Sequence, residues 1–220
     1  MPGYDTRMLD VPVGAKRLKI RALSDKQQYA DPQGEAERAG ICSASWSLFG
    51  QLWPASRVLA KAVKHIDIDE RRILELGCGL GLPSLILQSR GADITASDHH
   101  PLSEPFLDHN AAINTLPALP YLDLPWSEPV ASGDKGQFNL IIGSDILYER
   151  GHAEQLAALI DQLASHKAKL VITCPGRPYR NRFSRLLEAH GFELTQTTLP
   201  FSTEEAPPFL GRILRYRRGA

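Results

Sequence analysis

Four short apolar runs recur along the middle of the chain. They are RILEL at residues 72–76, ADITA at 92–96, FNLIIGS at 138–144 and KLVITC at 169–174. Apolar and β-branched residues dominate these runs without strict alternation, which is typical of parallel strands buried on both faces. We therefore expect four strands in the interior of a sheet.

Between these runs, apolar residues recur at helical spacing. They fall on one helical face in residues 58–66, again in 156–163 and again in 183–187. Strands that alternate with helices predict a doubly wound, mostly parallel α/β sheet of the Rossmann-like type, with right-handed crossovers. Ligands of such sheets bind at the carboxyl ends of the strands.

The two ends of the chain depart from this alternation. Residues 16–23 alternate between polar and apolar, which predicts a short, half-exposed strand or hairpin ahead of the core. Residues 191–199 and 209–217 are strand-like with no helix between them. We expect this second pair to form an antiparallel hairpin that closes the sheet.

Length and composition narrow the classes of function. The 220 residues suit a single domain over 1–220, with an N-terminal extension at 1–45 and a core at 46–220. The 25 basic and 25 acidic residues give zero net charge, so neither nucleic acid nor an anionic membrane is an expected partner. Three widely spaced cysteines and the lack of any apolar stretch of about 18 residues predict a reduced, cytoplasmic protein.

A glycine-rich turn, ELGCGLGLP at residues 75–83, follows the first core strand. Glycines let the backbone approach a ligand closely, and Pro83 suits the first turn of a helix. A dinucleotide fingerprint would need glycine or alanine at Leu82, whereas the third glycine here is Gly81, which disfavours a NAD-linked oxidoreductase. The spacing G-x-G-x-G after an acid is instead the pattern of S-adenosylmethionine (SAM) sites, where Glu75 suits the ammonium of the ligand and the helix N-terminus suits its carboxylate.

A second acid stands where a ribose would be bound. Asp98 follows the 92–96 strand, 21 residues after Gly77. A carboxylate can accept hydrogen bonds from both hydroxyls of a ribose, which explains why an acid is needed there. The alternative role for Asp98 is to cap a helix that starts near Pro101.

With these residues in hand, the chain resembles the seven-β-strand SAM-dependent methyltransferases, and within them the lysine-methyltransferase branch called methyltransferase family 16. Three further motifs carry the branch resemblance: LWPAS at 52–56, LPW at 124–126 and GSDILY at 143–148. The resemblance implies a seven-stranded sheet and a cofactor site with SAM as methyl donor. It assigns to that site Trp53, Glu75, Gly77, Cys78, Gly79, Gly81, Asp98, His99, Trp126 and Ser144. Taken singly, Trp53 or Trp126 could also be an ordinary packed aromatic residue.

The resemblance makes Asp145 and Tyr148 the catalytic candidates, because they form the D-x-x-Y of the branch at the end of the 138–144 strand. A lysine ammonium has no lone pair, so a carboxylate and a phenol there could orient the amine and take or relay its proton. The alternative is that Asp145 caps a turn and Tyr148 packs. Nucleic-acid amino-methyltransferases carry [DN]-P-P-[YFW] at this position, and this chain does not.

Other polar residues receive no role. Methyl transfer from a sulfonium needs no metal, and the neighbouring His99 and His100 cannot easily converge on one, so we expect no metal site. Asn110 and Asn114 lie where the second helix of the branch often carries asparagines, but could equally face solvent or cap locally. Arg177 lies in a region that resembles the branch, yet loop arginines are commonly solvated, so it stays outside the predicted site.

These observations favour a SAM-dependent methyltransferase that methylates a protein lysine by in-line transfer and leaves S-adenosylhomocysteine as product. The alternatives are N-methylation of a small amine, or a non-catalytic regulator that binds SAM. Residues 93–161 contain eleven acidic and two basic residues, a net charge of −9, which suits a cationic acceptor.

Overall fold

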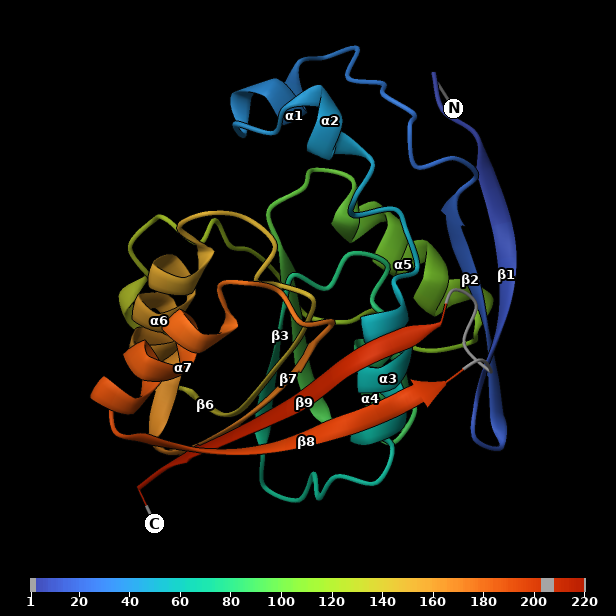
Figure 1. Cartoon of the computed structure of the whole chain (residues 1–220). Coiled ribbons are helices and arrows are strands. Elements are labelled where there is room, and N and C mark those ends of the chain that lie inside the picture. The colour runs from blue at the N-terminus through green and yellow to red at the C-terminus, as the bar shows by residue number, and fades with distance from the viewer. Residues whose placement is uncertain (1–2, 203–207, 220) are drawn as a thin grey trace.

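The computed structural model describes residues 3–202 and 208–219. Its centre is a seven-stranded sheet with the order β5-β4-β3-β6-β7-β9-β8 (Figure 1). The pairs from β5 to β7 are parallel, and β9 runs antiparallel to both β7 and β8. The strands are β3 (Arg72–Leu76), β4 (Asp93–Asp98), β5 (Tyr121–Asp123), β6 (Phe138–Ser144), β7 (Ala164–Cys174), β8 (Phe192–Ser202) and β9 (Phe209–Arg218).

The predicted fold class is confirmed, including the antiparallel hairpin at the end of the chain. Two of the four predicted core strands have the predicted bounds, residues 72–76 and 138–144. By contrast, β7 starts at Ala164, five residues before the apolar run, because Ala164 pairs with Phe138 ahead of a shift in register. The short strand β5 has no apolar run of its own and is found only from its pairing with β4.

Helices cover both faces of the sheet and divide the core in two (Figure 1). One face carries α3 (Pro54–Val63), α4 (Leu82–Gln88) and α5 (Ser103–Ile113). The other carries α6 (His152–Leu163) and α7 (Arg180–Ala189). Because both faces are covered, the inner strands are almost completely buried, as their continuous apolar sequences require.

The N-terminal extension begins with a separate two-stranded antiparallel sheet, β1 (Thr6–Val13) with β2 (Lys16–Leu23). Its apolar residues are buried in the same core as α3, α4 and α5, and β2 contacts α5. The side-chain amide of Asn110 on α5 accepts from Arg21 N at 2.7 Å and donates to Arg21 O at 3.3 Å. Asn114 binds the backbone of Lys19 in the same way, so the two asparagines fasten β2 to α5.

After this hairpin the chain passes through α1 (Glu35–Arg38) and α2 (Ser43–Trp46), which lie apart from the sheet in Figure 1. Residues 39–49 reach the carboxyl ends of β3 and β4, where the carbonyls of Ala39 and Phe49 contact the loops that follow these strands. The extension thus borders the edge of the sheet where ligands are expected. In the described part of the chain, no helix has the length and apolar character needed to cross a membrane.

Candidate active site

The glycine-rich turn leaves β3 and enters α4. Gly77 has a φ of 62°, and a Cβ atom there would lie 3.1 Å from Ile146 Cγ2 and 3.2 Å from Trp126 Cζ2. At Gly79, with a φ of 51°, a Cβ would lie 2.8 Å from the carbonyl oxygen of Phe49. Side chains would be strained in this backbone conformation and would collide with these neighbours, so both positions require glycine.

Gly81 and Cys78 complete the turn. Gly81 precedes the first residue of α4 with a φ of 77°, and a Cβ there would collide with Leu107 on α5. Cys78 donates its backbone N–H to Ser97 O at 2.9 Å, which ties the turn to β4. Burial raises the pKa of the Cys78 thiol well above its ordinary value, so the side chain stays protonated and acts as an apolar group.

Glu75 is completely buried in β3. Its Oε2 accepts hydrogen bonds from the backbone N–H and the hydroxyl of Ser84, at 3.0 and 2.5 Å, at the start of α4. Its Oε1 is buried and has no hydrogen-bond partner among the described residues. Burial raises the pKa of this carboxyl to about 8. A buried acceptor with one open oxygen beside the glycine turn fits the ammonium of SAM, as the sequence predicted.

Asp98, at the end of β4, joins the glycine turn to its own loop. Its Oδ2 accepts from Gly79 N at 2.8 Å, and its Oδ1 accepts from the backbone N–H groups of His99 and His100 at 2.8 and 3.0 Å. Burial raises the pKa of the carboxyl. The helix-cap alternative is wrong, because α5 starts at Ser103 and its cap residue, Leu102, makes no side-chain cap.

The two histidines that follow Asp98 point to different partners. His99 pairs through Nδ1 with Asp123 Oδ1 at 2.9 Å and through Nε2 with the carbonyl of Ala39 at 3.0 Å. His100 stacks on Phe49 with ring centroids 3.9 Å apart. Both therefore bind residues 39–49, where the N-terminal extension meets the core, to the carboxyl end of β4. Among the described residues, no group of three or more histidine, cysteine or acidic side chains is placed to hold a metal ion.

The two predicted cofactor tryptophans differ in what they touch. Trp126 packs against Gly77, as the contact distances above require, and lies edge-on to His152 with ring centroids 4.8 Å apart. Trp53 directly precedes α3 and donates its indole N–H to Leu48 O at 2.9 Å. Trp126 is thus part of the glycine-turn surroundings, whereas Trp53 supports the segment that leads to Phe49.

Asp145 and its partner Arg177 form an ion pair at the carboxyl ends of β6 and β7. The turn after Ser144 gives Asp145 a φ of 56°, a conformation that aspartate tolerates, and its N–H donates to Thr173 O at 2.8 Å. Arg177 Nε and Nη2 donate to the two carboxylate oxygens, both at 2.7 Å. The sequence pattern pointed to Arg177 as part of the branch resemblance but left it outside the predicted site, although it follows β7, the neighbour of the strand that precedes Asp145.

Tyr148 lies on the exposed side of the same turn, 39% exposed, and packs edge-on against His152 with ring centroids 4.6 Å apart. Burial of the phenol oxygen and nearby carboxylates raise its pKa, so the hydroxyl stays neutral and can donate a hydrogen bond but cannot serve as a base near neutral pH. His152, which sequence reasoning missed, lies between Tyr148 and Trp126. Burial lowers the pKa of its imidazole, which favours the neutral form.

Comparison with known proteins identifies this arrangement. A family model described as lysine methyltransferase matches residues 43–189, which is well over half of the chain. The chain belongs to the lysine methyltransferase family. It is therefore a SAM-dependent methyltransferase, as the glycine spacing and the D-x-x-Y motif predicted.

Curated relatives of this lysine methyltransferase agree with the family. Protein N-lysine methyltransferase METTL21A of Danio rerio is 29% identical over 165 residues, which cover 70% of this chain and 75% of that protein. Histone-arginine methyltransferase METTL23 of Xenopus laevis is 27% identical over 103 residues, 44% of each chain. The relatives thus include proteins named for lysine and for arginine.

Solved structures share the fold at lower identity. The 16S rRNA methyltransferase RsmC of T. thermophilus, in complex with AdoMet and guanosine, gives a TM-score of 0.64 at 15% identity, over 100% of this chain and 52% of that one. The magnesium protoporphyrin IX methyltransferase of Synechocystis, with bound SAM, gives 0.57 at 17% identity, over 77% and 86%. These likenesses confirm the Rossmann-like methyltransferase fold.

Part of the net charge of −9 on residues 93–161 is neutralised by ion pairs. Four of the eleven acids in this segment pair with basic residues outside it. At the carboxyl edge of the sheet, exposed acids of this segment include Asp123 and Glu149. The pairs are Arg72 with Asp93, Arg177 with Asp145, Arg182 with Glu154 and Arg218 with Asp161.

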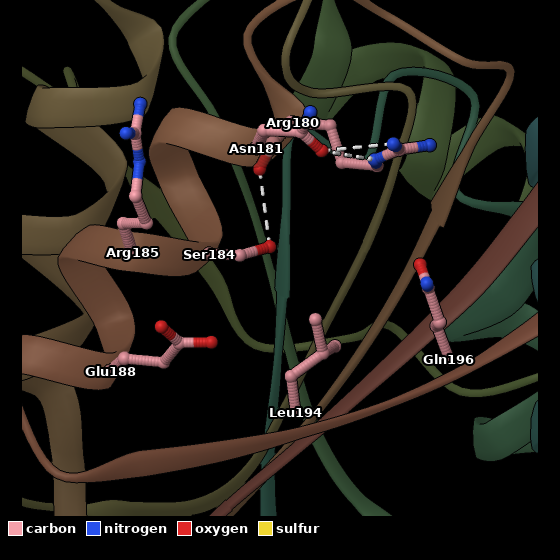
Figure 2. Close-up of a pocket in the computed structure, with 7 residues that line it drawn as sticks. All are labelled: Arg180, Asn181, Ser184, Arg185, Glu188, Leu194 and Gln196. Carbon is pink, nitrogen blue, oxygen red and sulfur yellow. Dashed lines mark hydrogen bonds between the residues drawn. The ribbon is translucent and has the colours of Figure 1, made fainter.

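A separate open groove of about 360 Å³ lies between α7 and β8 (Figure 2). Ser184 lies at its centre and donates its hydroxyl to Arg180 O at 3.1 Å, while the Arg180 guanidinium binds Asn181 Oδ1. The predicted site residues do not line it. The seven lining residues are Arg180, Asn181, Ser184, Arg185, Glu188, Leu194 and Gln196.

Proposed function

We propose that this enzyme methylates the side-chain amine of a lysine in a protein. One observation supports the placement of the acceptor above all others: the turn that carries Asp145 packs directly on the glycine turn. Ile146, the next residue, lies 3.1 Å from the position of a Cβ on Gly77. The candidate acceptor groups and the candidate cofactor groups therefore share one edge of the sheet. METTL21A, a relative named for lysine, supports the same acceptor.

We assign the cofactor to the surroundings of the glycine turn. Glu75 Oε1 is the open acceptor for an ammonium, and Asp98 is positioned by Gly79 to receive ribose hydroxyls. When bound, SAM supplies an electrophilic methyl group on a sulfonium. The other residues that we propose for this site are Trp53, Gly77, Cys78, Gly81, His99, Trp126 and Ser144.

The residues of this chain mainly orient the acceptor and exclude water. A lysine amine must lose its proton before its lone pair can attack, since its ordinary pKa is about 10.4. The Asp145 carboxylate can accept a hydrogen bond from the amine and help to remove that proton, while the face of the Tyr148 ring favours the cationic form on entry. The oxygen of the neutral Tyr148 hydroxyl can accept a hydrogen bond from an N–H of the amine, which orients the nitrogen and leaves its lone pair free to attack the methyl group. In-line alignment is then the principal contribution of the site.

We keep the wider predictions as proposals. The chain acts as one domain in which residues 1–45 extend a core at 46–220, and its partner is a protein substrate rather than nucleic acid or a membrane. The thiols of Cys42, Cys78 and Cys174 are free, which supports a reducing compartment, for which we propose the cytoplasm.

The test uses purified enzyme, methyl-labelled SAM and a size-fractionated cell extract. Label in protein that yields methyllysine after hydrolysis is the expected result, and Asp145→Asn should reduce it by about a hundredfold while SAM affinity, measured by calorimetry, stays unchanged. Tyr148→Phe should reduce methyllysine formation less than Asp145→Asn does, because the aromatic ring remains. Label confined to the small-molecule fraction would contradict the lysine assignment, and full activity of Asp145→Asn would remove Asp145 from the chemistry.

A further inference from the structure

The Asp145 carboxylate is already engaged by a guanidinium. Arg177 approaches it side-on, with Nε on Oδ1 and Nη2 on Oδ2, both at 2.7 Å. This is the planar fork in which an arginine matches a carboxylate most closely. The Asp145 side chain is only 10% exposed, so this edge of the carboxylate is fully used.

Arg177 lies in the loop that connects the end of β7 to α7. Its partner is fixed by the same strand, because Thr173 O in β7 accepts a 2.8 Å hydrogen bond from the backbone N–H of Asp145. The Arg177 side chain is 38% exposed, and its charge also acts on the Tyr148 phenol. The guanidinium therefore binds one candidate acceptor group, Asp145, and acts electrostatically on the other, Tyr148.

This geometry distinguishes between the two cationic side chains that could be methyl acceptors, arginine and lysine. A guanidinium acceptor would need the forked edge of Asp145, which Arg177 occupies. An ammonium needs only one lone pair on one oxygen, and each oxygen keeps a second lone pair beyond its bond to Arg177. An arginine acceptor would also keep its positive charge beside Arg177, because a guanidinium does not lose its proton in proteins, whereas a lysine that enters as a cation loses its charge before it reacts.

We propose that Arg177 is the specificity-determining residue that restricts this enzyme to amines by filling the guanidinium-binding edge of Asp145 with an internal guanidinium. The inference rests on the proposed lysine methylation. It explains how the D-x-x-Y motif of this chain could accept lysine and reject arginine. Arg177 acts through Asp145, so it positions a catalytic group and has no chemical step of its own.

The experiment compares wild type with Arg177→Gln and Arg177→Lys. Each protein is incubated with methyl-labelled SAM and the protein fraction of a cell extract, the labelled protein is hydrolysed to amino acids, and the ratio of methylarginine to methyllysine is measured. Arg177→Gln should raise this ratio by on the order of tenfold and lower methyllysine formation. Arg177→Lys keeps a cation but makes no fork, so its ratio should lie between the other two.

Two controls separate specificity from folding. Arg180→Gln changes a neighbouring arginine that binds Asn181 and lines the groove in Figure 2, and it should leave the ratio unchanged. Unchanged SAM affinity and melting temperature in Arg177→Gln would exclude a damaged fold. Because the measurement is a ratio, partial unfolding would lower both products and would not move it.

The outcomes are distinguishable. Methyllysine from wild type with a higher ratio in Arg177→Gln supports the inference. Methyllysine from wild type with an unchanged ratio in a folded Arg177→Gln overturns the inference and leaves the proposed function intact. No methyllysine from wild type contradicts the proposed function, and the inference falls with it.

Discussion

Glu75 illustrates how one side chain can serve both the fold and the site. The carboxyl is buried in β3, where Oε2 holds the start of α4 and Oε1 remains without a partner among the described residues. Burial raises its pKa to about 8 from an ordinary value of 4.5. In the free enzyme the proton therefore stays on Glu75 through most of the neutral range, and a bound ammonium would favour its release.

A stability measurement tests this protonation. The folded state holds the Glu75 proton up to about pH 8, while the unfolded chain releases it near 4.5, so the folded state loses stability as pH rises between these values. Glu75→Gln cannot lose a proton. The unfolding free energy of wild type, relative to Glu75→Gln, should therefore fall by up to a few kcal/mol between about pH 5 and about pH 8, since each pKa unit is worth about 1.4 kcal/mol.

Titrating groups that do not interact with Glu75 cancel in that comparison, whereas Asp98, whose charge contributes to the raised pKa of Glu75, does not cancel fully. His100, whose pKa is lowered to about 4 by burial, is present in both proteins. Denaturant unfolding of the two proteins at several pH values gives the difference directly. A difference that is independent of pH would show that Glu75 is already ionised in the folded protein.

At the scale of elements, the N-terminal hairpin is attached by side chains rather than by a shared sheet. Asn110 lies on α5 and Asn114 directly follows the helix, and each amide bonds to both backbone groups of one residue in β2. In this way a helix satisfies backbone groups at the edge of a strand, which would otherwise stay open to another chain. Asn110 is completely buried and also donates to Leu80 O beside the glycine turn.

Asn110→Ala should therefore destabilise the protein more than Asn114→Ala. The first change leaves buried polar groups of Arg21 and Leu80 without their partner and should cost about 2–4 kcal/mol, while the second, at a half-exposed position, should cost about 1 kcal/mol. Urea unfolding gives both values. Hydrogen exchange should be faster in β1 and β2 of Asn110→Ala than in wild type. An equal loss of unfolding free energy in the two variants would contradict the importance of burial.

These contacts also separate the features that local sequence patterns predict from those that depend on residues distant in the chain. Local patterns sufficed for β3, β6, the glycine turn and Asp98, because each is defined within a few residues. The partner of Asp145 is 32 residues away, and the partner of Asn110 in β2 is 89 residues away. Backbone acceptors have no sequence signature, so the role of Asn110 could not be predicted. Arg177 was set aside as a loop arginine, although its place after β7, the strand next to Asp145, could have included it in the predicted site.

At the scale of the whole molecule, one edge of the sheet gathers segments that are distant in the chain. The N-terminal segment reaches it through Ala39 and Phe49, the glycine turn through Gly79, and the later loops through Trp126 and Asp145. Residues 39–49 are fixed there by the bond of His99 to Ala39 O and by the stacking of His100 on Phe49. The core thus supplies all seven strands of the main sheet, and residues 39–49 lie against the loops at its carboxyl edge.

We therefore expect cofactor binding to stabilise residues 39–49. Because the carbonyl of Phe49 lies against Gly79 and Gly79 binds Asp98, a ligand that engages Asp98 stabilises the turn beneath residues 39–49. Hydrogen exchange of these residues should slow several-fold when SAM is added, while β8, on the far side of the sheet, should change little. Asp98→Ala is the matched control, since without the carboxylate that we propose binds the ribose, the same SAM concentration should give no protection. Protection confined to 75–98 would mean that the extension borders the site without responding to the cofactor.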